Sequence, residues 1–359
     1  MRASKVFKPA GIVLCAAALL SGCSKAGNQF APPAGSAPMA APNRQHGAHP
    51  ANCTPTLWAS GRAQGHPGGV NGYVAANSAP CITLHGSYNG LPLTGLYTLA
   101  IGSSPNYLYV PDIYNYRIVV FDYSGNYVKW LSTKLGNTNY EPWGVCVSSQ
   151  GVLGVGNIQE GAAQGNVEFF PPNAASGSLP TGDATGQLQR QTDCAFDSAG
   201  NFFVEDGTNT GNSHIDYLAS SNVGLPGQTL VDSGLGSGEW VGTYSRVDSP
   251  ADQTLSVGIN TPDSATQKVY TWTVNGPATG PLTFTPCACS PYTFHHYPHN
   301  TGNAMDDVSP STGGASGVLY IADYGKGRIL QGPANGGHVT TYETLRGALG
   351  VVTNPSGQY

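Results

Sequence analysis

Two segments that lie far apart in the chain carry nearly the same residues at the same offsets. Residues 108–118 read LYVPDIYNYRI and residues 319–329 read LYIADYGKGRI. Looser copies end at Asn157, Asp206 and Asn260. Each copy has a short β-prone run that finishes in Asp or Asn, a polar turn, and a second β-prone run. The chain is therefore expected to repeat one small β unit.

The spacing of the copies indicates the architecture. Intervals of 45, 49, 54 and 63 residues separate the five Asp or Asn positions. A period near 50 residues built from short strands is typical of β-propeller blades with four strands each. We interpret the recurring side chains as structural turn residues, because Asp and Asn stabilise turns with their own side chains. They are Asp112, Asn157, Asp206, Asn260 and Asp323. Arg117 and Arg328 follow at one fixed offset, and we expect them to pair with these carboxylates.

The two ends of the repeat region complete one more blade. The C-terminal residues 347–359 read as the first strand and turn of a copy that has no second strand. Residues 57–61, LWASG, match the missing second strand, and residues 70–76 and 81–86 supply the third and fourth. Pairing of the C-terminal strand with the N-terminal strands would leave no free edge. We therefore predict an all-β fold, a six-bladed β-propeller with four-stranded blades, over residues 53–359.

The N-terminus has the layout of an export signal. A basic leader precedes a short apolar run over residues 10–20, which is too short to span a bilayer comfortably. The sequence Leu20-Ser21-Gly22-Cys23 resembles the bacterial lipobox. The resemblance implies cleavage of residues 1–22 as a lipoprotein signal peptide and lipidation of Cys23. An ordinary signal peptide with a coincidental cysteine is the alternative.

Residues 23–52 are rich in Ala, Pro and Gly and show no period, so we expect a lipidated, disordered tether. The residue after the lipid site, Ser24, implies the outer membrane in bacteria that have two membranes. We expect an extracytoplasmic, membrane-anchored lipoprotein, periplasmic or at the cell surface. The formal net charge of -5 argues against a nucleic-acid partner, which requires a basic face.

Six cysteines remain beyond the signal peptide and the lipid site. They are Cys53, Cys81, Cys146, Cys194, Cys287 and Cys289. An even number in an oxidising compartment indicates disulfides, and six cysteines allow 15 connectivities. A Cys146–Cys194 bond would join the first strands of consecutive blades. A Cys53–Cys81 bond would fasten the tether to the propeller.

Residues 108–125 and 319–329 resemble NHL-type repeats. Propellers similar to these include protein-interaction modules, lactonases of the regucalcin and gluconolactonase group, and lyases. Such a fold does not by itself select a function. The chain has no Gly-x-Ser-x-Gly, His-Glu-x-x-His or P-loop motif.

Acidic and aromatic residues near the starts of first strands form the candidate binding site. These positions line the mouth of the central channel in many propellers. The residues are Glu141, Trp143, Asp193, Trp240 and Asp306. The resemblance to regucalcin-type lactonases implies a divalent metal such as calcium at this mouth. Thr192 stands where that family has Asn before Asp, so solvated carboxylates at loop ends are the alternative.

A second cluster lies in residues 287–300, CACSPYTFHHYPHN. Cys287, Cys289, His295, His296 and His299 are ligand types that bind zinc. Their spacing matches no zinc pattern, and export favours oxidation of the thiols, so we interpret the histidines as loop residues or as part of a channel-mouth surface.

Two functions follow. The first is a binding or interaction module at the cell envelope, with a protein, a glycan or a small molecule as ligand. The alternative is a metal-dependent lactonase-like hydrolase, or a lyase, with its site at the channel mouth.

Overall fold

The computed structural model is all-β, apart from two short 3-10 helices, η1 (Ile113–Asn115) and η2 (Ser220–Asn222), in its described part. It describes residues 53–61, 69–103, 106–135, 138–159, 165–186, 188, 193–206, 214–236, 241–247, 253–259, 267–286, 292–295, 307–310, 318–323, 327–333, 337–345 and 347–353. The predicted signal peptide, Cys23 and the tether lie outside these residues. No helix among them is both long and apolar enough to cross a membrane.

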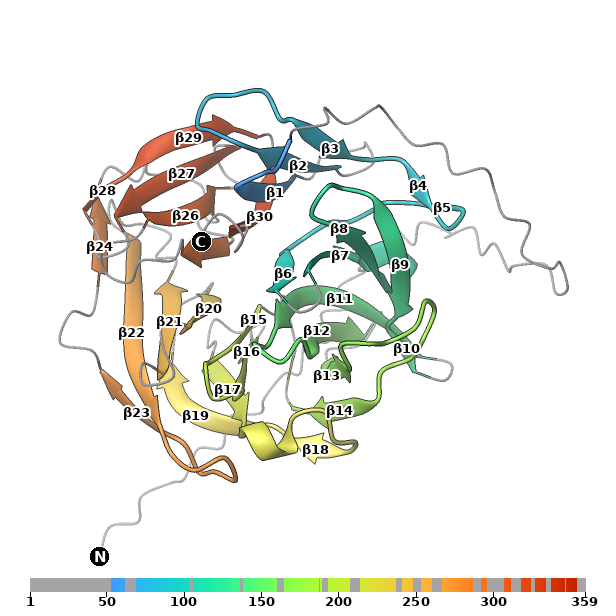
Figure 1. Cartoon of the computed structure of the whole chain (residues 1–359). Coiled ribbons are helices and arrows are strands. Elements are labelled where there is room, and N and C mark those ends of the chain that lie inside the picture. The colour runs from blue at the N-terminus through green and yellow to red at the C-terminus, as the bar shows by residue number, and fades with distance from the viewer. Residues whose placement is uncertain are drawn as a thin grey trace, which may run out of the picture. The chain divides into compact units, whose positions relative to one another are not determined.

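The N- and C-terminal strands share one sheet, as the sequence predicts. Its strands are β1 (Leu57–Gly61), β2 (Gly69–Tyr73), β3 (Ile82–Leu84) and β30 (Ala348–Thr353), in the order β3-β2-β1-β30. β1 and β30 are antiparallel, with Leu57 opposite Thr353. The last described strand of the chain therefore covers the edge of the first, and the predicted closure is confirmed (Figure 1).

The remaining strands form the other sheets in chain order. The β6–β9 sheet contains β6 (Ala100–Ser103), β7 (Asn106–Asp112), β8 (Arg117–Asp122) and β9 (Tyr127–Ser132). The β11–β14 sheet contains β11 (Thr138–Val147), β12 (Leu153–Gln159), β13 (Gly165–Phe170) and β14 (Gly182–Thr185), with β10 (Lys134–Leu135) and β18 (Gln228–Thr229) at its edges. The β15–β19 sheet contains β15 (Cys194–Phe196), β16 (Phe202–Asp206), β17 (His214–Leu218) and β19 (Val231–Gly236).

Two more sheets complete the ring. One contains β20 (Val241–Val247), β21 (Gln253–Ile259), β22 (Gln267–Asn275), β23 (Thr283–Pro286), β24 (Tyr292–His295) and β28 (Gly337–His338). The other contains β25 (Asp307–Pro310), β26 (Val318–Asp323), β27 (Arg328–Pro333) and β29 (Thr340–Thr344). A separate hairpin pairs β4 (Ser87–Tyr88) with β5 (Leu91–Pro92).

The sheets surround a central axis as the blades of a β-propeller (Figure 1). The innermost strands contact one another in the order β6, β11, β15, β20, β25 and β30, and β30 contacts β6. The propeller has five blades, so the predicted number of six is not confirmed. Hydrogen bonds nevertheless divide the described strands into six sheets of at least four strands. The parallel pairs β14–β18 and β24–β28 extend two sheets toward the next segment of chain, so the blades depart from regular four-stranded units.

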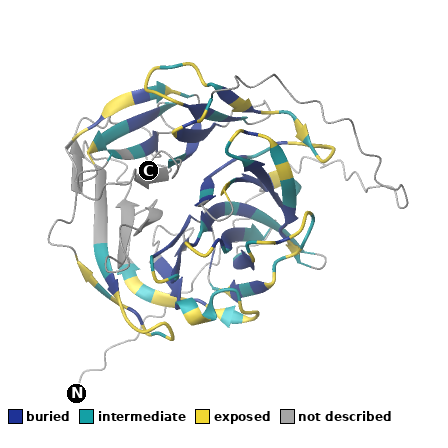
Figure 2. Ribbon diagram, viewed as in Figure 1, coloured by how far each residue is buried: buried dark blue, intermediate teal, exposed yellow. Residues whose placement is uncertain are grey.

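The hydrophobic core is divided among the interfaces between neighbouring sheets. Successive strand residues point to opposite faces, so one strand can serve two interfaces. In β1, Leu57 and Ala59 pack toward Ile329 of β27, whereas Trp58 packs toward Val110 of β7. Buried residues accordingly lie along the strands of the sheets, and exposed ones concentrate in the connections (Figure 2).

The predicted turn residues occupy three different situations. Asp112 ends β7, and its Oδ2 accepts a hydrogen bond from Arg117 Nε at 2.8 Å, which is the pairing expected from the repeat. Asp206 and Asp323 end β16 and β26. Asn157 does not end its strand. It lies inside β12, which continues to Gln159, because the pairing with β13 continues past Asn157 to Ile158. Asn260 falls outside the described residues.

Candidate functional site

β11 is irregular halfway along its length, and Trp143 is the residue at the irregularity. Pro142 of β11 pairs with Asn157 of β12, and Gly144 of β11 pairs with Gly156 of β12. Trp143 therefore has no partner residue of its own. This two-against-one arrangement is a β-bulge, a device that re-aims a side chain and is common beside binding sites. The bulge therefore gives the Trp143 indole a direction that a regular strand would not.

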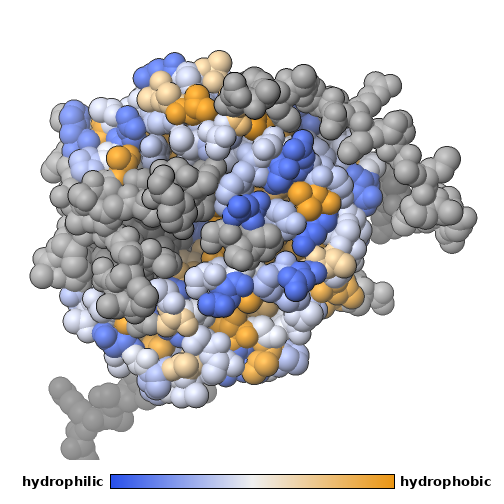
Figure 3. Space-filling model, viewed as in Figure 1, coloured by the Kyte–Doolittle hydropathy of each residue, from blue (hydrophilic) through white to orange (hydrophobic). Residues whose placement is uncertain are grey.

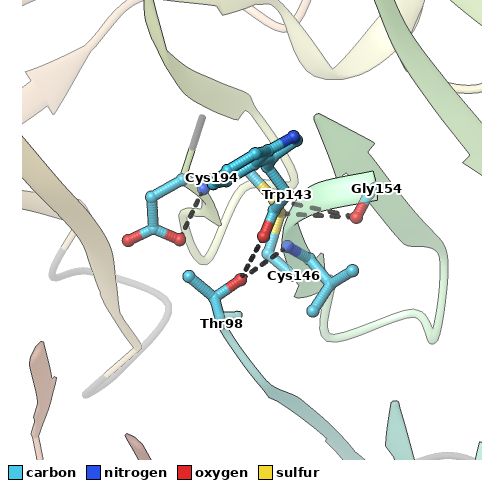
Figure 4. The surroundings of a disulfide bond; sticks show 7 residues. Thr98, Trp143, Cys146, Gly154 and Cys194 are labelled. Atoms are coloured by element: carbon cyan, nitrogen blue, oxygen red, sulfur yellow. Dashed lines mark hydrogen bonds between the residues drawn. A yellow bond between two sulfur atoms is a disulfide. The ribbon is translucent and has the colours of Figure 1, made fainter. Parts of the chain in front are cut away.

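Hydrogen bonds from the adjacent sheet hold the bulge in place. The hydroxyl of Thr98, just before β6, donates to the carbonyl oxygen of Trp143 at 3.1 Å. The same hydroxyl oxygen accepts the backbone N–H of Val145, also at 3.1 Å. One buried side chain thus satisfies two backbone groups that the bulge removes from the strand ladder. Figure 4 shows Thr98 facing Trp143 across this junction.

The Trp143 indole is half-buried and packs against one aromatic and two aliphatic side chains, from the segment before β6, from η1 and from β30. Its ring lies 5.1 Å from the Tyr97 ring, measured between centroids, with an interplanar angle of 65°. Ile113 of η1 and Leu349 of β30 complete the cluster. Because Tyr97, Ile113 and Leu349 are buried, the cluster presents Trp143 as its exposed member.

Glu141 and Trp143 form a pair, as their proximity in sequence suggests. The indole Nε1 donates a hydrogen bond to Glu141 Oε2 at 3.2 Å. Both side chains are partly exposed. The pairing orients the indole plane and places a carboxylate beside it.

Asp193 stands at the start of β15 but is buried. Its Oδ1 accepts the backbone N–H of Cys194 at 2.8 Å, and its carbonyl oxygen accepts the backbone N–H of Glu205 at 2.9 Å. The side chain is 6% exposed. These contacts give Asp193 a structural role directly before β15.

A disulfide joins the innermost strands β11 and β15. Cys146 and Cys194 are bonded, with their Cα atoms 5.6 Å apart, and both sulfurs lie against the carbonyl of Gly154 (Figure 4). A second disulfide joins Cys53 to Cys81 beside β3. Both pairings anticipated from the sequence are therefore present, and the first fixes the relative position of Trp143 and Asp193 across the two strands.

The other candidate residues lie outside the described part of the chain. They are Trp240, Asp306, Cys287, Cys289, His296 and His299; His295 ends β24, but its side chain is not described. Within the described residues, no three His, Cys, Asp or Glu side chains gather as a metal centre. The divalent metal therefore stays a prediction.

Tyr97 and Thr98 are the site residues that the sequence reasoning missed. Tyr97 precedes Asp112 by 15 residues, and Trp143 precedes Asn157 by 14. The repeat thus places an aromatic residue at almost the same offset in two consecutive copies. Alignment on the turn residues, extended backward, would have found Tyr97; nothing in the sequence marks Thr98.

The exposed surface around the site is mixed. On the face seen in Figure 3, hydrophobic residues are scattered among neutral and hydrophilic ones. The large exposed hydrophobic residues of the described chain come from separate elements: Val74, Leu91, Tyr114, Val128, Leu179, Leu225 and Val231. Large contiguous apolar patches mark docking surfaces, and this scatter does not favour one here.

Comparison with known proteins supports the fold. No protein-family model matches the chain, and no curated protein matches its sequence. A protein of unknown function from Bacteroides caccae is 10% identical, with a TM-score of 0.51 over 83% of this chain and 98% of that one. A functionally unknown protein from Desulfotomaculum acetoxidans is 10% identical, with a TM-score of 0.50 over 82% and 98%.

A gluconolactonase from Xanthomonas campestris is also similar, at 13% identity and a TM-score of 0.46, over 84% of this chain and 89% of that one. Likeness at these identities concerns the fold and does not extend to activity. The NHL resemblance, the signal peptide and the lipid anchor stay predictions.

Proposed function

We propose that this protein is a lipid-anchored, extracytoplasmic propeller that binds a carbohydrate of the cell envelope at Trp143 of β11. The observation that carries the proposal is the β-bulge at Trp143, which presents a half-buried indole from a rigid inner strand. Bulges are devices for aiming a side chain, and Trp is prominent among residues that dominate binding energy.

The chemistry of the pair Glu141 and Trp143 favours a ligand that is both flat-faced and rich in hydroxyls. The indole N–H is already used by Glu141, so the ring offers its apolar face. The Glu141 carboxylate is an acceptor-only group, and each carboxylate oxygen can accept more than one hydrogen bond, including bonds from hydroxyl donors. A sugar ring combines an apolar face with such donors.

The site is also pre-organised, which reduces the cost of binding. Thr98 holds the backbone of Trp143, and Tyr97 packs against its ring. The Cys146–Cys194 bond ties β11 to the next inner strand. A ligand would therefore meet side chains that are already ordered.

The location of the protein rests on the first 52 residues and on the disulfides. Two disulfides fit an oxidising compartment outside the cytoplasm. Replacement of Cys23 by Ser should release the full chain from the membrane fraction in a bacterial host. Retention of the Cys23→Ser protein on the membrane would contradict the lipid anchor.

Titration of the full chain with soluble envelope polysaccharides, followed by tryptophan fluorescence and calorimetry, tests the ligand. Trp143→Ala should weaken binding at least tenfold, because the stacking surface is lost. Trp130→Phe is the matched control, since Trp130 lies on the outer strand β9 against Gly177. Equal weakening by both variants, or none by Trp143→Ala, would contradict this site. Metal-dependent lactone hydrolysis that Asp193→Ala abolishes would instead support the hydrolase.

A further inference from the structure

The β11–β14 sheet buries polar side chains in the face that packs against the β6–β9 sheet. In β13, Val167 and Phe169 pack toward the β15–β19 sheet. Glu168 and Phe170 alternate with them and so point the other way, and Phe170 belongs to the core shared with Ile118 of β8. Glu168 thus lies in an interface that is otherwise apolar.

Strand pairing brings a second carboxylate and two amides to Glu168. Asp183 of β14 is directly opposite Glu168, so the two side chains lie on the same face as cross-strand neighbours. Asn166 is opposite Asn157 of β12, and Asn157 Nδ2 donates to Asn166 Oδ1 at 3.1 Å. Since positions 166 and 168 share a face, these four side chains form one group, which we call the Glu168 cluster.

Three oxygens of the cluster lack a hydrogen-bond donor. Glu168 and Asn157 are fully buried, and neither carboxyl oxygen of Glu168 nor Asn157 Oδ1 has a hydrogen-bond partner. Native proteins rarely leave buried polar atoms unsatisfied, and such atoms require an explanation. Burial, and then the negative charge of Asp183, raise the pKa of Glu168 to about 8, although the nearby Asn157 and Asn166 amides lower it.

The charge that acts on Glu168 is therefore another carboxylate and not a cation. The two carboxylates also act on Tyr140 of β11. Burial raises the pKa of Tyr140 most, and the negative charges of Glu168 and Asp183 raise it further. A buried carboxylate beside a like charge must take up a proton or a cation to avoid a large cost. The cluster supplies two carboxylates and an amide oxygen, which are hard ligands.

We propose that the Glu168 cluster binds a calcium-class divalent cation through Glu168, Asp183 and the amide oxygen of Asn157. Calcium takes six to eight oxygen ligands and accepts carboxylates, amide oxygens and water together. A bidentate Glu168 with one oxygen each from Asp183 and Asn157 would supply four, so water or backbone carbonyls complete the shell. This site lies between two sheets, on β12, β13 and β14, and is independent of the proposed carbohydrate site.

The half-exposed Asp183 gives the cluster a route to solvent. Its Oδ1 accepts the backbone N–H of Gly227 at 2.9 Å, and the side chain is partly exposed. We assign Oδ2 to the cation, and Asp183 is the member of the cluster that meets solvent. Because the donor set is small, we expect an affinity in the range of about 10⁻⁴ to 10⁻³ M, as in extracellular modules.

Calcium binding to the full chain tests the proposal directly. Protein freed of metal with EDTA, and then dialysed at pH 8.5, would be titrated with CaCl₂ by calorimetry and by equilibrium dialysis with radioactive calcium. We expect one calcium ion per chain and a rise in the thermal midpoint on addition. Glu168→Gln should weaken this binding at least tenfold, and Asp183→Asn should weaken it less.

Glu343→Gln on β29 is the matched control, because it removes one carboxylate of the same type outside the cluster. It should bind calcium as the wild type does. Glu168→Gln is nearly isosteric and removes a buried charge, so the variant should fold. A cooperative unfolding transition in EDTA would verify that it is folded. Asp183→Asn gives a second, independent measurement of calcium binding. Unchanged binding in both cluster variants, or no binding of calcium at millimolar concentration, would overturn the proposal.

Discussion

Arg117 shows how much one side chain can hold together in this fold. Its guanidinium bonds Asp112 and also donates to the carbonyl oxygens of Tyr88 at 2.7 Å and Leu91 at 2.9 Å, and it is 1% exposed. It therefore joins the end of β7 to the β4–β5 hairpin. Each of the three guanidinium nitrogens donates a hydrogen bond to an oxygen of the protein.

Arg117→Met should lower the free energy of unfolding by about 3–5 kcal/mol, since it leaves the Asp112 carboxylate buried without its ion-pair partner. Urea unfolding followed by circular dichroism would measure the change. Lys134→Met is the control: Lys134 is exposed over the Tyr116 ring and should cost at most about 1 kcal/mol. Similar losses in the two variants would show that the buried ion pair adds little.

The Glu168 carboxyl predicts a particular dependence of stability on pH. Its pKa is raised from 4.5 to about 8 in the folded state, so the folded chain binds more protons than the unfolded chain between these values. In EDTA, stability is then greatest below the unfolded pKa and falls as pH rises through the folded one, by about 1.4 kcal/mol per pH unit from this group.

Denaturant unfolding of the full chain at pH 5, 6, 7 and 8 would measure that slope. Glu168→Gln should flatten it, because glutamine does not titrate. The control Glu343→Gln should keep the wild-type slope. A wild-type slope that survives in Glu168→Gln would assign the pH dependence to other groups.

At the scale of strands, the two disulfides differ in burial, and we expect them to react differently. Cys146 and Cys194 are 7% and 4% exposed, whereas Cys53 and Cys81 are only partly buried. Thiol–disulfide exchange requires access of the attacking thiolate to the sulfur. Under native conditions, a mild reductant should open Cys53–Cys81 first and leave Cys146–Cys194 intact.

Alkylation of the free thiols followed by peptide mass spectrometry would give the order of reduction. The double variant Cys146→Ser with Cys194→Ser should also lower the free energy of unfolding by about 4 kcal/mol, from the loss of loop-closure entropy. Earlier reduction of Cys146–Cys194 would mean that the inner strands separate readily in the native state.

These strand-level features divide into those that the sequence predicts and those that it does not. Closure by β1 and β30 could be predicted, because a repeat period places each strand in a blade. The period also puts Cys146 and Cys194 on neighbouring first strands, but six cysteines allow 15 connectivities, so the sequence named the two disulfides as candidates without choosing them. The Trp143 bulge could not, since one extra residue in a strand leaves no mark on the period. The Glu168 cluster was missed because a glutamate in a β-prone run reads as an exposed position, and its burial depends on the face that the neighbouring sheet covers.

At the scale of the whole molecule, the number of blades is the feature that the repeat spacing predicts least well. The copies are separated by intervals that grow from 45 to 63 residues along the chain. The structure also contains the parallel pairs β14–β18 and β24–β28, which a count of repeats does not anticipate. The ring nevertheless closes, because its closure depends on the pairing of two specific strands and not on equal blades.

That dependence can be tested by removing β30. A chain that ends at Gly347 loses the inner strand that pairs with β1 and contacts β25 and β6. Leu57 and Ala59 then lose their packing against Ala348 and Val351, and β1 becomes an exposed, hydrophobic edge. Exposed edges of this kind pair with other chains.

We expect aggregation in size-exclusion chromatography and loss of a single cooperative unfolding transition, whereas a chain that ends at Thr353 and keeps β30 should stay monomeric and cooperative. A monomeric, cooperative protein without β30 would show that the sheets hold the ring through their packed faces alone, and that strand pairing at the closure is dispensable.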